Sequence, residues 1–129
     1  MDIHNRTGQP MDIHIRVIPH AEQRYDTVGD WYFDKTRDLQ IRVSKQRDDR
    51  HEWLIAVHEM VEALQCMEDG VTQQEVDDFD FAWAGLGEPG DDPTAPYHQQ
   101  HVNTTAIEVV LASMLLVGWK RYLREVASE

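Results

Sequence analysis

Hydrophobic and polar positions alternate in the first third of the chain, which is the pattern of half-buried β-strands. Residues 12–18 and residues 39–43 alternate along their length, and residues 30–34 form a third, more aromatic candidate. The short polar turn at residues 34–38 predicts that the second and third strands form a hairpin. The positions expected on the buried face are Ile13, Ile15, Val17, Leu39, Ile41 and Val43.

The hydrophobic period changes after residue 50, where a helix is expected. Asp48 or Asp49 is placed to cap its start, and Gly70 to end it. Between residues 54 and 64 apolar side chains cover nearly the whole circumference, at about 100° per residue. A helix that is apolar nearly all round is buried, so this helix is expected to form the centre of the fold.

Further helices are expected in the second half of the chain. Thr72 begins a capping-box spacing that opens one helix. A Gly- and Pro-rich loop at residues 85–96 then precedes a long helix over about residues 97–117, and a short terminal helix follows over about residues 119–126. The expected core face of the long helix consists of Ile107, Val110, Leu111, Met114 and Leu115.

These elements predict an α+β fold in one domain over residues 1–129. We expect a small, three-stranded, mainly antiparallel sheet, covered by the buried helix and by one or two further helices. The polar residues 1–11 are expected to form a disordered tail. His51 is expected near solvent at the start of the buried helix, and Trp53 in the core.

The buried helix carries three polar residues, His58, Glu59 and Glu62, among its apolar neighbours. A buried charge without a partner is costly, so these side chains must face something that satisfies them. His58 and Glu62 are four residues apart and therefore stack one turn apart on the same face. Two ligand-type side chains in this arrangement predict half of a metal site.

The later long helix carries a second polar stripe, formed by His98, His101 and Glu108. At about 100° per residue these three positions fall within a narrow arc. We predict that the two stripes face each other across one cation, with His58, Glu62 and one of His98 or His101 as ligands. His101 is preferred because it lies deeper in the helix, and Glu108 is expected to be a spare ligand or to orient a histidine ring.

The run His58-Glu59-Met60-Val61-Glu62 resembles the H-E-x-x-H helix of the zincins, which are zinc-dependent peptidases, with Glu62 in place of the second histidine. The layout of strands, motif helix and later histidine helix is also similar to small phage-encoded zincin-like proteins. The resemblance implies one Zn²⁺ per chain, with His58 and Glu62 as ligands and Glu59 as the general base. It also implies hydrolysis of peptide-like amide bonds, in a peptide or protein substrate that the sequence does not identify.

Two other functions remain open. A metal bound by four protein ligands, for example His58, Glu62, His101 and Glu108, would be a structural site in a non-catalytic accessory protein. Alternatively, the acidic residues Glu59, Glu62, Glu75 and Asp78 have the loose spacing of all-helical, magnesium-dependent nucleoside triphosphate pyrophosphohydrolases. That reading requires an all-α fold and leaves the histidines without a role.

Charge and cysteine content limit the expected partners and the expected compartment of the protein. The formal net charge is −12, from 24 acidic and 12 basic residues, which disfavours nucleic acid and anionic membranes as main partners. The single cysteine, Cys66, is consistent with a reducing compartment. No stretch resembles a signal peptide or a membrane span, so a cytoplasmic location is expected, in the host cytoplasm if the protein is phage-encoded.

Overall fold

The three predicted strands form one mixed sheet in the computed structural model, which describes residues 10–129. The strands β1 (Ile13–Ile18), β2 (Gly29–Phe33) and β3 (Leu39–Ser44) are arranged in the order β1-β3-β2. β2 pairs with β3 as the expected antiparallel hairpin. β1 pairs with β3 in parallel, so the sheet is mixed and not mainly antiparallel. After β1 the chain crosses to the far edge of the sheet, where it forms β2. It then returns as β3, which lies between the other two strands.

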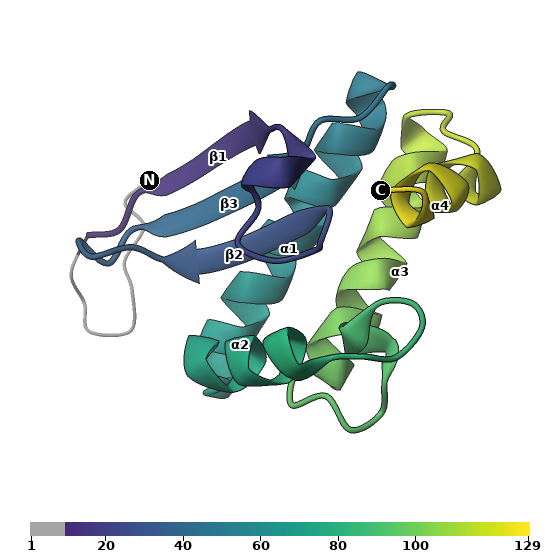
Figure 1. Cartoon of the computed structure of the whole chain (residues 1–129). Coiled ribbons are helices and arrows are strands. Elements are labelled where there is room, and N and C mark those ends of the chain that lie inside the picture. Colours follow the sequence, from purple (N-terminus) through teal and green to yellow (C-terminus); the bar gives the residue numbers. More distant parts are fainter. Residues whose placement is uncertain (1–9) are drawn as a thin grey trace.

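The sheet buries one strand much more deeply than the others. In β3 the side chains of Leu39, Ile41 and Val43 are fully buried. Ile15 and Val17 in β1 lie in register with Ile41 and Val43, yet they are 50% and 46% exposed. The long helix α1 (Asp49–Asp69) packs on β2 and β3, which leaves this part of the edge strand β1 less covered (Figure 1).

Helix α1 begins and ends where the sequence predicts. The Asp48 side chain accepts a hydrogen bond from the Arg50 amide and caps the first turn. Gly70 ends the helix in the left-handed conformation, with φ of 75°, which glycine adopts without a Cβ clash. Between these ends the helix lies between the sheet and a second long helix, α3 (His98–Met114), so two of its sides are covered (Figure 1).

The remaining elements close the ends of this α1–α3 pair. Helix α2 (Gln73–Ala82) starts with the predicted capping box between Thr72 and Glu75. Short 3-10 turns lie at His20–Glu22 (η1) and Pro89–Asp91 (η2), and α4 (Trp119–Ala127) packs at the C-terminal end of α3 (Figure 1). The α+β fold class is confirmed, with four α-helices beside the small sheet within residues 10–129.

The orientation of α3 differs from the prediction. Ile107, Val110 and Met114, expected in the core, are 46%, 60% and 74% exposed, while Leu111 and Leu115 are partly buried. The buried face of α3 is instead mainly polar, because it presents the histidine and glutamate stripe to α1. The buried residues of α3 are Gln100, His101, Thr104, Glu108 and Ala112.

Three smaller expectations about burial need correction. His51 is only 1% exposed, because α4 covers it and Glu125 binds its ring. Trp53 is 52% exposed and lies outside the core. The disordered tail expected at residues 1–11 lies mostly outside the described residues, but Met11, which is described, is buried in the core.

None of the helices in residues 10–129 combines the length and the apolar character that a membrane crossing needs.

Candidate metal centre

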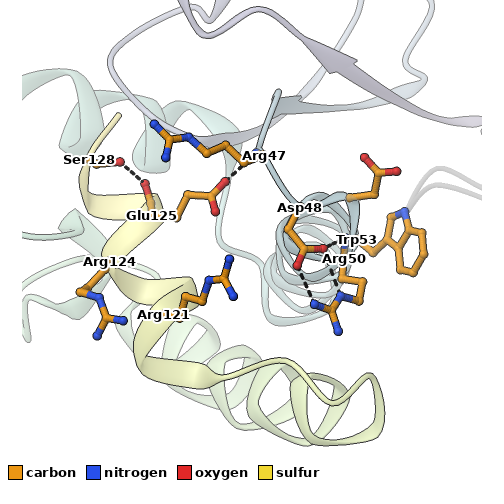
Figure 2. Close-up of a pocket in the computed structure, with 9 residues that line it drawn as sticks. Arg47, Asp48, Arg50, Trp53, Arg121, Arg124, Glu125 and Ser128 are labelled. Carbon is orange, nitrogen blue, oxygen red and sulfur yellow. Dashed lines mark hydrogen bonds and ion pairs between the residues drawn. The ribbon is translucent and has the colours of Figure 1, made fainter.

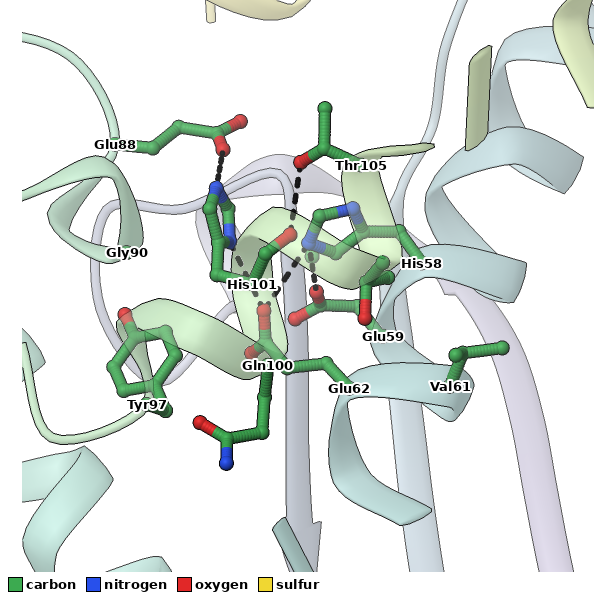
Figure 3. Close-up of polar contacts among 12 residues, drawn as sticks. His58, Glu59, Val61, Glu62, Glu88, Gly90, Tyr97, Gln100, His101 and Thr105 are labelled. Carbon is green, nitrogen blue, oxygen red and sulfur yellow. Dashed lines mark hydrogen bonds and ion pairs between the residues drawn. The ribbon is translucent and has the colours of Figure 1, made fainter. Parts of the chain in front are cut away.

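Three buried side chains from two helices meet between α1 and α3 (Figure 3). One carboxylate oxygen of Glu62, Oε2, lies 3.2 Å from His58 Nε2 and 3.0 Å from His101 Nδ1. The rings of His58 and His101 are 4.9 Å apart at their centroids. One ligand atom from each of the three residues lies within 4.8 Å of the others, a spacing that suits a shared metal ion.

The fold places these atoms through helix geometry and helix packing. His58 and Glu62 lie one turn apart on the face of α1 that contacts α3. His101 comes from the first turns of α3, directly opposite. Trp31 in β2 supports the carboxylate from the sheet side, because its indole N–H donates to Glu62 Oε1 at 3.2 Å. Glu62 therefore uses one oxygen for the sheet and the other for the two histidines.

Glu108 orients His58 from behind. Its Oε1 accepts a hydrogen bond from His58 Nδ1 at 2.7 Å, while the buried hydroxyl of Tyr122 donates to its Oε2. A donor Nδ1–H fixes the tautomer that leaves Nε2 as the ligand atom. Nε2 is the atom that faces Glu62, so Glu108 contacts the outer nitrogen of this ring, and its orienting role at a metal site stays a prediction.

Glu59 lies beside the three ligands without joining them. Its Oε2 is 3.9 Å from His58 Nε2, and 12% of its side chain is exposed. Burial, followed by the charge of Glu62, raises the pKa of Glu59 well above its ordinary value. The backbone of Gly29 packs so closely that a Cβ there would lie 2.8 Å from Glu59 Cγ, so glycine leaves room for this side chain.

His101 also contacts acidic residues of the loop before α3. Its Nε2 lies 2.9 Å from Asp91 Oδ1 and 3.3 Å from Glu88 Oε2. Gly90 lets this loop approach, because a Cβ at that position would lie 2.5 Å from His101 Nδ1. His98 is not part of the cluster, since its Nδ1 binds the carbonyl oxygen of Gly90 at 2.9 Å.

Glu88 and Asp91 were missed from the sequence. They lie in the Gly- and Pro-rich stretch that appeared to be only a connection. Their position in the sequence could have indicated them. The two carboxylates come shortly before the histidine pair, in a loop whose glycines allow the backbone to approach a histidine ring closely. Together with His101 they form a second, more exposed group that could hold a cation.

The electrostatics of the cluster favour positive charge. Burial alone would lower the pKa of His58, but its hydrogen bonds to Glu108 and Glu62 raise the pKa well above 6.5. Burial likewise opposes protonation of His101, yet Glu62 and Glu88 raise its pKa to about 10. Burial would raise the pKa of Glu62, but the two histidines lower it to about 2. Without a metal, the cluster thus keeps Glu62 ionised and favours the protonated, positively charged form of both imidazoles.

A buried aspartate lies close to this cluster. The Asp80 carboxylate accepts hydrogen bonds from Tyr25 and Tyr97, and the Tyr97 ring lies 6.3 Å from the His101 ring. Burial raises the pKa of Asp80 to about 6. Tyr97 thus lies near the cluster, but its hydroxyl is held by Asp80.

One other group in residues 10–129 could hold a cation. Asp12, His14 and Asp38 meet where β1 begins beside β3, and His14 Nε2 lies 3.2 Å from Asp38 Oδ2. Asp12 and His14 are exposed, so this group lacks the burial that distinguishes His58, Glu62 and His101.

No protein-family model matches the chain, and neither a curated protein nor a solved structure matches it. The geometry of the site therefore carries the functional argument.

Proposed function

We propose that the protein is a zinc-dependent hydrolase of peptide-like amide bonds, with zinc bound by His58, Glu62 and His101. The observation that carries the proposal is the buried meeting of two imidazole nitrogens and one carboxylate oxygen within 4.8 Å. Two histidines and one glutamate form a ligand set found in catalytic zinc sites. Magnesium and calcium prefer oxygen ligands, so the two nitrogens favour zinc.

In this proposal Glu59 is the general base. A zinc ion would lower the pKa of a bound water and polarise a substrate carbonyl. Glu59 Oε2 lies 3.9 Å from the His58 ligand atom, and burial raises the pKa of Glu59 well above its ordinary value, which suits a group that accepts a proton and returns it. Its role would be to take the proton of the attacking water and pass it to the leaving nitrogen.

A pocket that includes Asp80 and part of the loop before α3 supports a substrate of more than minimal size, although none of the three proposed zinc ligands lines it. This pocket, of about 530 Å³, is bordered by Asp80 and by Gly87 and Pro89, which flank Glu88 in the chain. Tyr25, Phe81 and Trp83 also line it, so aromatic surface is available to apolar side chains. A peptide or protein segment fits such a lining.

The structural-metal alternative is less well supported by the contacts. It requires a fourth protein ligand, and Glu108 was the candidate. Glu108 instead binds the outer nitrogen of His58 and the hydroxyl of Tyr122, so both of its oxygens are engaged away from the shared point. Three protein ligands with a neighbouring carboxylate are the arrangement of catalytic zinc sites.

The pyrophosphohydrolase alternative conflicts with the fold. It requires an all-α protein, whereas the chain contains a three-stranded sheet. Glu75 is used in the capping box of α2, and Asp78 accepts a hydrogen bond from Gln74 on the surface of the same helix. Neither carboxylate therefore joins Glu59 and Glu62.

The test of the proposal is the substitution Glu59→Gln in zinc-loaded protein. We expect the variant to retain zinc and thermal stability. Its rate of cleavage of a mixed peptide library, measured by mass spectrometry, should fall by roughly a hundredfold or more. Glu22→Gln, which neutralises an exposed glutamate in η1, is the matched control and should cleave normally. Unchanged cleavage by Glu59→Gln, or no cleavage by the zinc-loaded wild type, would contradict the proposal.

A further inference from the structure

A second pocket lies at the other end of α1, where the start of that helix faces α4 (Figure 2). Its volume is about 920 Å³, and it is separate from the metal cluster, roughly two turns of α1 before His58. We refer to it as the arginine pocket. It is lined by Arg47, Arg50, Trp53, Arg121, Arg124 and Ser128, together with three carboxylates, those of Asp48, Asp49 and Glu125.

The arginines of this pocket are unusual for so acidic a chain. Four of the 12 basic residues line it, although the net charge is −12. Arg50 is structural, because it binds Asp48 at 2.7 Å and the Leu115 carbonyl at 3.2 Å. Within residues 10–129, the guanidinium groups of the other three, Arg47, Arg121 and Arg124, make no ion pair (Figure 2).

The carboxylates that line the arginine pocket are already engaged. Asp48 holds Arg50, and Asp49 lies 3.3 Å from Lys45. Glu125 accepts from the backbone amide of Arg47 at 2.7 Å and lies 2.9 Å from the buried His51 ring. The carboxylates are thus directed to other donors, and the three remaining guanidinium groups are available to an anion from solution.

The geometry suits an anion with several oxygens. Arg121 and Arg124 are three residues apart on α4, about one helical turn, and both line the pocket. Arg47 comes from the link before α1, and its side chain runs towards the C-terminal end of α4, near Glu125 and Ser128 (Figure 2). One guanidinium group can bind two phosphate oxygens at once through two of its N–H donors. Three guanidinium groups that line one pocket therefore match a ligand with more than one phosphate.

Trp53 adds a flat apolar surface to the same pocket. Its side chain is 52% exposed, although tryptophan is a residue that proteins usually bury for the most part. An exposed indole that lines the pocket from α1 offers a stacking surface for a planar ring. The pocket therefore combines the two parts of a nucleotide site, a phosphate-binding group and a ring-binding group.

We propose that the arginine pocket binds a nucleoside diphosphate or triphosphate, with the phosphates at Arg47, Arg121 and Arg124 and the base against Trp53. A small ligand is favoured over nucleic acid, because the net charge of −12 repels a long polyanion while a single pocket still attracts a short one. This inference is independent of the proposed hydrolase activity.

Isothermal titration calorimetry of the full chain with ADP tests the proposal. We expect the double variant Arg121→Gln/Arg124→Gln to bind ADP about tenfold more weakly or worse. The matched control is Arg16→Gln/Lys35→Gln, which removes two exposed cations from the sheet side and should bind ADP like the wild type. Trp53→Ala should weaken ADP binding but leave pyrophosphate binding unchanged.

Several outcomes would overturn the proposal. They are an absence of ADP binding at millimolar concentration, equal binding by the Arg121→Gln/Arg124→Gln variant, and tighter binding of a single-stranded oligonucleotide than of ADP. Equal affinity for pyrophosphate and ADP would overturn the assignment of the ring to Trp53. Circular dichroism of each variant verifies folding, and all substituted residues are exposed.

Discussion

Glu108 shows how one residue can determine the chemistry of another. Its contact with His58 Nδ1 decides that Nε2 is the nitrogen presented to Glu62. Tyr122 holds the second oxygen of Glu108, so the carboxylate is itself fixed from α4. Residues that orient a metal-binding histidine in this way affect metal affinity without touching the metal.

The substitution Glu108→Gln is therefore expected to weaken zinc binding by about 10- to 100-fold. The amide can present its nitrogen to His58, which removes the acceptor that fixes the Nδ1–H tautomer. Competition with a zinc chelator measures the effect. Tyr122→Phe should weaken zinc binding less, because Glu108 keeps its contact with His58, and zinc affinity that is unaffected by Glu108→Gln would refute this role.

At the residue scale, the sequence predicted which side chains share a face of the same helix. His58 and Glu62 are four apart in a helix, so their shared face follows from the sequence alone. Contacts from outside the two helices could not be predicted in this way. Trp31 reaches Glu62 from the sheet, and Glu88 and Asp91 reach His101 from a loop whose path depends on the packing.

Helix α3 shows what is decided at the scale of an element. Its polar stripe faces inward and several of its apolar residues face outward, contrary to the prediction from hydrophobicity. The prediction assumed that the most apolar face is the buried face. In α3 the histidine and glutamate stripe faces α1. The apolar face and this polar stripe lie on different sides of the helix, so both cannot be fully buried. The sequence therefore predicted that the helix exists, but not fully how it is rotated.

Two lysine substitutions on α3 test this rotation. Val110→Lys, at a position that is 60% exposed, should change the free energy of unfolding by about 0.5 kcal/mol or less. Ala112→Lys, at a position that is 2% exposed, should destabilise by about 3 kcal/mol or more, because it buries a charge and overfills the core. Urea unfolding measures both variants, and a larger loss for Val110→Lys would show that the helix is rotated otherwise.

At the scale of the whole molecule, the cluster connects protonation to stability. Glu62, whose pKa is lowered to about 2, stabilises the fold above its ordinary value of 4.5 and loses this effect as the pH falls through about 2. His101, whose pKa is raised to about 10, stabilises the fold below 6.5 and loses this effect as the pH rises through about 10. Asp80, whose pKa is raised to about 6, favours folding below 3.8 and loses this effect as the pH rises through about 6.

Chelator-treated protein is therefore expected to be more stable at pH 6 than at pH 9. The reason is that His101 remains protonated in the folded state while the unfolded chain has already released that proton at pH 9. Urea unfolding in the presence of a chelator measures the difference. Zinc should stabilise the protein more at pH 9, because fewer protons compete for the imidazole nitrogens. Equal stability at the two pH values without metal would contradict these protonation states.

The central claim is that His58, Glu62 and His101 bind one zinc ion between α1 and α3. Anomalous diffraction at the zinc absorption edge, from crystals of protein purified without chelator, tests this claim most directly. We predict one peak per chain, within bonding distance of His58 Nε2, His101 Nδ1 and a Glu62 oxygen. A zinc peak only at the exposed Asp12, His14 and Asp38 group, or no zinc peak, would contradict the claim.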